Sequence, residues 1–73
     1  MSRIVIAYRR HGPAGETVAG TEICNGFKNP EAAFAAIRGV AQKRRVQPEE
    51  LAVFQDGVHV PHPRKPLVVG RFA

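Results

Sequence analysis

The segment Asn29–Arg45, NPEAAFAAIRGVAQKRR, is the only long helical pattern in the sequence, so the remaining residues must fold around it. Asn29 is a favourable N-cap, and Pro30 suits the first helical position because its missing N–H group would have no partner there. Gly39 interrupts the pattern, and we expect it to allow close contact with a strand. The apolar residues gather on one side of this predicted amphipathic helix: Ala33, Phe34, Ile37, Val40 and Ala41.

Two segments before the helix have strand character. Arg3–Arg10 is rich in β-branched residues, and Thr17–Cys24 is a weaker strand in which Gly20 predicts a bulge or a weak point. Between them lies His11–Glu16, with two glycines and a proline, which predicts a turn and hence an antiparallel hairpin. The glycines of this loop lack the spacing of a dinucleotide fingerprint or a P-loop, so we interpret it as a turn only.

The chain after the helix divides into short segments. Pro48–Leu51 predicts a single helical turn, and Asp56 and Gly57 predict a two-residue hairpin turn between the strands Ala52–Gln55 and Val58–Val60. A competing interpretation extends the helical turn from Pro48 to Gln55, because short apolar runs are ambiguous. The last segments are expected to be an extended proline-rich connector, residues 61–66, and a final strand, residues 67–72.

The length fits a single small α+β domain, residues 1–73, with an antiparallel sheet of four to five short strands packed on one main helix, in the order β-β-α-β-β. One helix covers only one face of such a sheet. We expect the valines of the second hairpin to face the helix, which leaves Phe54 and His59 on an open face with Arg3 and Arg9. The alternatives are that Phe54 is a core residue, either because the faces are reversed or because the second face is buried in a dimer.

The charge balance favours a polyanionic partner. Eleven Lys and Arg residues oppose six Asp and Glu residues, which gives a net charge of +5. The best interpretation is a small basic nucleic-acid-binding module with low sequence specificity, in which arginines hold phosphates and an aromatic ring stacks on bases. The candidate site residues are Arg3, Arg9, Arg10, Lys43, Arg44, Arg45, Phe54, His59, Arg64 and Lys65.

Each basic cluster also has an explanation that needs no ligand. Lys43, Arg44 and Arg45 stabilise unpaired carbonyl groups at a helix carboxyl end, and Arg64 and Lys65 increase solubility. The alternative function is a protein–protein interaction or accessory protein that acts through the open face or an edge strand, as a homodimer or with another chain.

Other classes have little support in the sequence. We expect no catalytic, cofactor or metal site: the His59-x-x-His62 spacing offers two ligands without a supporting cysteine pair, and Cys24 is the only cysteine. A single cysteine excludes an internal disulfide and fits a reducing, cytoplasmic location. The chain has no apolar run near 18 residues, so we expect no membrane span, and the apolar core of its first residues is too short for a signal peptide.

Overall fold

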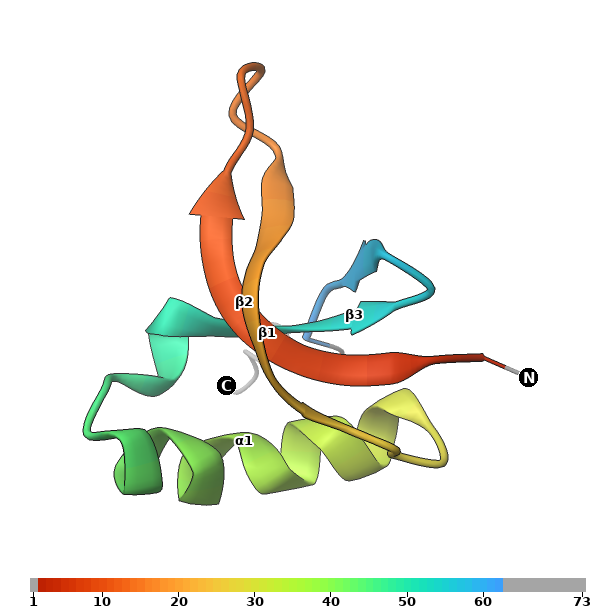
Figure 1. The fold of residues 1–73 in the computed structure, drawn as a ribbon, viewed down its shortest axis with the longest axis vertical. Coiled ribbons are helices and arrows are strands. Elements are labelled where there is room, and N and C mark those ends of the chain that lie inside the picture. Colours follow the sequence, from red (N-terminus) through yellow and green to blue (C-terminus); the bar gives the residue numbers. More distant parts are fainter. Residues whose placement is uncertain (1, 63–73) are drawn as a thin grey trace, which may run out of the picture.

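The computed structural model describes residues 2–62, and within them four strands form one antiparallel sheet in the order β2-β1-β3-β4. The predicted α+β class and the order β-β-α-β-β are confirmed, with α1 against one face of the sheet (Figure 1). The predicted last strand, residues 67–72, lies outside the described residues. The elements are β1 (Ile4–His11), β2 (Thr17–Asn25), α1 (Pro30–Arg44), the 3₁₀ turn η1 (Pro48–Glu50), β3 (Leu51–Gln55) and β4 (Val58–Val60).

The ends of α1 follow the sequence pattern. Asn29 Oδ1 accepts a hydrogen bond from the Ala32 N–H group at 2.9 Å, which satisfies one of the free donors of the first turn. At the other end Arg45 takes the left-handed conformation, with φ 58°, and donates its N–H group to carbonyls of the last turn. The expectation for Gly39 is wrong: it is exposed, and no atom of a strand lies within 4 Å of the position a Cβ would occupy.

The second hairpin has the predicted register. Val53 lies opposite Val60 and Phe54 opposite His59. Asp56 and Gly57 both have positive φ, 53° and 84°, as the two-residue turn of a twisted hairpin requires. The competing helix from Pro48 to Gln55 is wrong, because the apolar run is buried as a strand between β1 and β4.

The first core lies between α1 and the sheet. It contains Ile4 and Ile6 of β1 and Val53 of the second hairpin, so Val53 faces the helix as predicted. Phe34, Ile37 and Val40 are partly buried against it, so the predicted apolar face of the helix is confirmed. The fully buried members are Ile4, Ile6, Ala33, Ala41, Leu51 and Val53.

A second core lies on the opposite face of the sheet, where the sequence predicts an open surface. It contains Val5, Ala7, Ala52 and Phe54, and the Phe54 side chain is only 1% exposed. The faces are assigned correctly, because successive residues of β1 and β3 alternate between the two cores. The expectation that Phe54 is accessible is nevertheless wrong.

The sheet covers this second face by bending over it. Ala7 lies opposite Glu22 but Arg9 lies opposite Ala19, so β2 carries an extra residue next to Gly20, and the predicted bulge is confirmed. A bulge bends its strand and increases the local twist. The hairpin of β1 and β2 therefore rises on the side opposite α1 (Figure 1), and β2 comes within 8 Å of β4, although two strands separate them in the sheet order.

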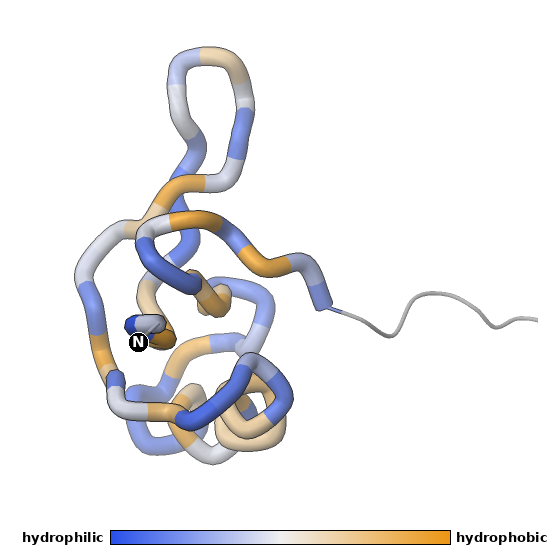
Figure 2. The backbone as a smooth tube through the Cα atoms, turned by 90° about the vertical axis from the view of Figure 1, so that its right-hand side faces the viewer, coloured by the Kyte–Doolittle hydropathy of each residue, from blue (hydrophilic) through white to orange (hydrophobic). Residues whose placement is uncertain are grey.

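The free end of the β1–β2 hairpin extends beyond the body of the molecule as an arm, residues 9–19. The pairing of β1 with β3 ends at Tyr8, so β2 is the only strand that pairs with β1 along the arm. Figure 2 shows the hydrophobic segments mainly in the body and largely hydrophilic or neutral residues along the arm. The arm therefore adds exposed surface and little core.

Substitutions at Phe54 test whether the second face of the sheet is buried. We expect Phe54→Ala to lower the free energy of unfolding by about 3–5 kcal/mol and Phe54→Leu by about 1 kcal/mol, because both leave a void among the residues of the second core. Val58→Ala is the control: Val58 is 67% exposed in the same hairpin and should change stability by less than about 0.5 kcal/mol. Urea denaturation measures all three, and equal small losses at both positions would mean that the second face is open.

Candidate nucleic-acid interface

The carboxylates of the chain are largely engaged in local structure. Glu16 Oε1 accepts a hydrogen bond from the Ala14 N–H group, and Glu50 Oε2 accepts one from Gln47 N–H, at 3.0 Å in each case. Asp56 Oδ1 accepts a hydrogen bond from the Arg3 N–H group at 2.8 Å. Glu31 and Glu49 lie in first helical turns, where the helix dipole stabilises negative charge.

Glu22 makes the only ion pair within residues 2–62, in which its Oε1 lies 2.8 Å from Arg3 Nη1. Hydrogen bonds from the side chains of Asn25 and then Arg3 hold the pKa of the Glu22 carboxyl below its usual value. Arg3 is therefore engaged in a bond within the protein. To bind a phosphate, as the sequence predicts, the Arg3 guanidinium would have to leave Glu22.

The remaining cations of the described part of the chain have no carboxylate partner. They come from both hairpin and helix, and each is exposed to solvent. Because the acids are held by local bonds, these side chains give the surface its positive character. The unpaired cations are Arg9, Arg10, Lys28, Arg38, Lys43, Arg44 and Arg45.

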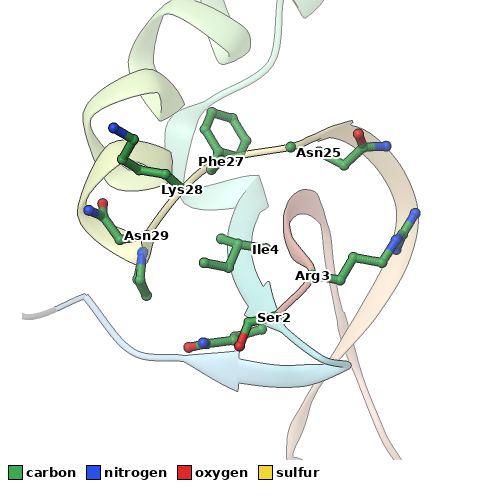
Figure 3. Close-up of a pocket in the computed structure, with 10 residues that line it drawn as sticks. Ser2, Arg3, Ile4, Asn25, Phe27, Lys28 and Asn29 are labelled. Atoms are coloured by element: carbon green, nitrogen blue, oxygen red, sulfur yellow. The ribbon is translucent and has the colours of Figure 1, made fainter.

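A hollow of about 890 Å³ lies at the amino end of α1, between the start of β1 and the chain that leads into the helix (Figure 3). Arg3 and Lys28 line it, which suggests an anion site at a helix amino terminus. Figure 3 shows instead that both side chains point away from the hollow, whereas Ile4 points into it. The charges of Arg3 and Lys28 therefore do not converge on an anion in this hollow.

A second depression, of about 500 Å³, lies where α1, η1, β3 and β4 meet. We call it the α1–β4 groove. Its cations come from separate elements, Arg9 from β1 and Arg38 from α1, and Glu49 is its only acid within the described residues. Its apolar lining includes Phe34, Ile37, Leu51, Val53 and Val60.

Two of the predicted site residues, Arg9 and His59, line this groove, and a third, Phe54, contacts the His59 ring without lining it. The His59 ring is half-buried, with its centroid 5.6 Å from that of Phe54, and Arg9 lies near enough to influence it. Burial first, and then the Arg9 guanidinium, lower the pKa of His59 below its ordinary value. Phe54 contacts the His59 ring and is too deeply buried to stack on a base itself.

Two groove residues escape the sequence prediction. The sequence pattern places Phe34 on the apolar face of the helix, and Arg38 is not among the candidate site residues, yet both line the groove. Their spacing of four residues places them one turn apart on neighbouring positions of α1, and this is the signal that could have found them. The ring of Phe34 also contacts that of His62, with centroids 4.8 Å apart.

The other predicted cations lie away from the groove lining. Arg10 lies on the opposite face of β1 from Arg9, and its side chain passes over Gly20, where a Cβ would come within 2.8 Å of Arg10 Cδ. Lys43, Arg44 and Arg45 are exposed at the carboxyl end of α1. Arg64 and Lys65 lie outside the described residues.

Residues 2–62 contain no group of three or more His, Cys, Asp or Glu side chains that could hold a metal ion. The rings of His59 and His62 contact different phenylalanines, Phe54 and Phe34 respectively. The loop that follows β1 forms the predicted turn, closed by a 2.7 Å hydrogen bond from Gly12 N–H to the Glu16 carbonyl. Cys24 is a free thiol partly buried against the first core.

Comparison with known proteins gives no further constraint: no protein-family model matches the sequence, and neither a curated protein nor a solved structure is detectably similar to it. Across the described residues, none of the helical segments has the length and apolar character needed to cross a membrane.

The left-handed backbone conformation of Arg45 allows two contributions to stability to be separated: the cost of that conformation and the benefit of a positive charge at the helix end. A side chain in this conformation costs about 1–2 kcal/mol, which glycine avoids. We therefore expect Arg45→Gly to raise the free energy of unfolding by about 0.5 kcal/mol or leave it unchanged, even though a favourable charge at the helix end is lost.

Arg44→Gly is the matched control, because it removes the same charge from a residue that is still helical. It should lower the free energy of unfolding by about 0.5–1 kcal/mol. Urea denaturation of the two variants gives the comparison. Equal losses would show that the conformation of Arg45 carries no cost.

Proposed function

We propose that this protein is a small basic nucleic-acid-binding module with low sequence specificity, located in the cytoplasm. The proposal is supported by a difference between the acidic and basic side chains of the protein. Four of the six acids are hydrogen-bonded within the fold, whereas Arg3 alone among the described cations has an ion-pair partner. The unpaired cations therefore remain free to neutralise phosphates, which dominate the affinity for nucleic acid.

The unpaired cations of the helix end and of the hairpin lie on neighbouring elements. η1 contacts both α1 and β1, so it connects the carboxyl end of the helix to the strand that leads into the arm. Lys43, Arg44 and the C-cap residue Arg45 lie at the carboxyl end of α1, and Arg9 and Arg10 lie in β1. Contacts of this kind position a nucleic acid without reading its bases, which supports low specificity.

The structure removes one argument for the alternative function, a protein–protein interaction module. The sheet face that the sequence leaves open is occupied by the second core, and among residues 2–62 the only large apolar side chain that is exposed is Val58. The edges of the described sheet are β2 and β4; β2 carries bulges and the charged Glu22, and β4 is only three residues long, all of which disfavour pairing with another strand. The geometry therefore favours the nucleic-acid proposal over a homodimer.

Affinity measured across a range of salt concentrations tests the proposal. Fluorescence anisotropy with labelled single strands and duplexes of mixed sequence should show binding at low ionic strength, with the logarithm of the association constant falling linearly with the logarithm of salt concentration. Arg44→Gln should reduce the slope by about 0.7 for single strands and about 0.9 for duplexes, because one phosphate contact is lost.

Lys28→Gln is the charge-matched control, since its side chain points outward at the other end of α1 and should leave the slope nearly unchanged (Figure 3). Absence of binding at low ionic strength would contradict the proposal. A variant with Arg64, Lys65 and Arg71 all replaced by serine tests the rest of the chain. If that change abolished binding while Arg44→Gln had no effect, the folded domain would not be the binding surface.

A further inference from the structure

The α1–β4 groove combines the features needed to hold one nucleotide. Its volume, about 500 Å³, falls within the range of roughly 300–1,000 Å³ typical of ligand sites. The lining joins the aromatic ring of Phe34 on α1 to one cation on the same helix, Arg38, and one on β1, Arg9, and the strands supply its apolar floor. Such a mixture of apolar surface and converging positive charge is complementary to a base joined to a phosphate.

Phe34 provides the aromatic surface. It is half-buried, so its ring is fixed against the first core while part of it lines the groove. It already contacts one flat ring, that of His62, at 4.8 Å with an interplanar angle of 59°. Stacking on such a ring is tolerant of base identity, because every base has a π face.

The phosphate-binding side is formed by Arg9, Arg38 and His59. Arg9 and His59 both line the groove, and the Arg9 guanidinium lies near enough to the His59 ring to help lower its pKa, so the ring contributes hydrogen bonding and not a positive charge. Arg38 lies one helical turn after Phe34. None of the three has a carboxylate partner within the described residues. Glu49 of η1 is the one acid in the lining, and Arg9 and Arg38 give the groove a net positive charge.

We propose that the α1–β4 groove binds one unpaired nucleotide of a single-stranded nucleic acid, with its base against Phe34 and its phosphate between Arg9, Arg38 and His59. This inference rests on the proposed function and makes it more specific. A base in a duplex is already stacked and paired, so its face is not available to Phe34. Single strands should therefore gain a contact that duplexes lack.

The test compares the affinities of groove variants for an oligothymidylate strand and for a duplex. Phe34→Leu should weaken binding of the single strand by about fivefold or more, as expected for the loss of a base–aromatic stack, and should leave duplex affinity nearly unchanged. Val40→Ala is the matched control, because Val40 packs partly buried against the same core and does not line the groove. Circular dichroism establishes that each variant is folded.

Arg38→Gln provides a second variant that does not depend on core packing, since Arg38 is exposed on a helix and glutamine is a good helix former. It should weaken single-strand binding more than Lys28→Gln, which removes an equal charge outside the groove. Equal effects of Phe34→Leu and Val40→Ala, or of Arg38→Gln and Lys28→Gln, would overturn the groove assignment while leaving the general function intact. Failure of the unmodified protein to bind either probe would overturn both proposals.

Discussion

Burial of β1 on both faces is the constraint on which the rest of the structure depends. Ile4 and Ile6 face α1, whereas Val5 and Ala7 face Phe54, and all of these side chains are almost completely buried. A chain with one long helix can shield only one of the two faces with that helix. The sheet shields the other by its own curvature, for which the bulge in β2 beside Gly20 provides the bend. Curvature thus replaces a second helical layer.

This closure determines where a partner can bind. A flat open sheet would offer Phe54 directly, but the bend encloses that ring and leaves the cations at the helix end, along the base of the arm and around the α1–β4 groove. Aromatic surface is still available through Phe34, on the other core. The same fold therefore moves the proposed contact from the face of the sheet to its junction with the helix.

The parts of the structure that depend on local chemistry can be predicted from the sequence. Asn29 and Pro30 locate the start of α1, and Asp56 and Gly57 fix the register that places Phe54 opposite His59. The alternation of side chains along β1 and β3 likewise predicts which residues share a face. Each of these features depends on residues that are close together in the sequence, so each can be predicted from the local residue pattern.

The cover over Phe54 has a different origin. It depends on how far the bulge in β2 bends the hairpin, which is a property of paired strands and not of either segment alone. The groove is missed because Arg9, Arg38 and His59 come from three elements that lie far apart in the sequence and come together only in the folded chain. Gly39 shows the opposite error: a helical glycine suggests close packing, but its position on the exposed side of α1 gives it no strand neighbour.

A chemical-shift titration of the amide and aromatic resonances with a single-stranded oligonucleotide tests the placement of the nucleic acid at the α1–β4 groove and the carboxyl end of α1. We expect the largest changes on the groove residues Phe34, Arg38 and His59 and on the carboxyl end of α1, while Val5 and Ala7 remain unaffected inside the second core. Changes centred on Arg3 and Lys28 at the other end of the helix, or on the buried residues around Phe54, would contradict it.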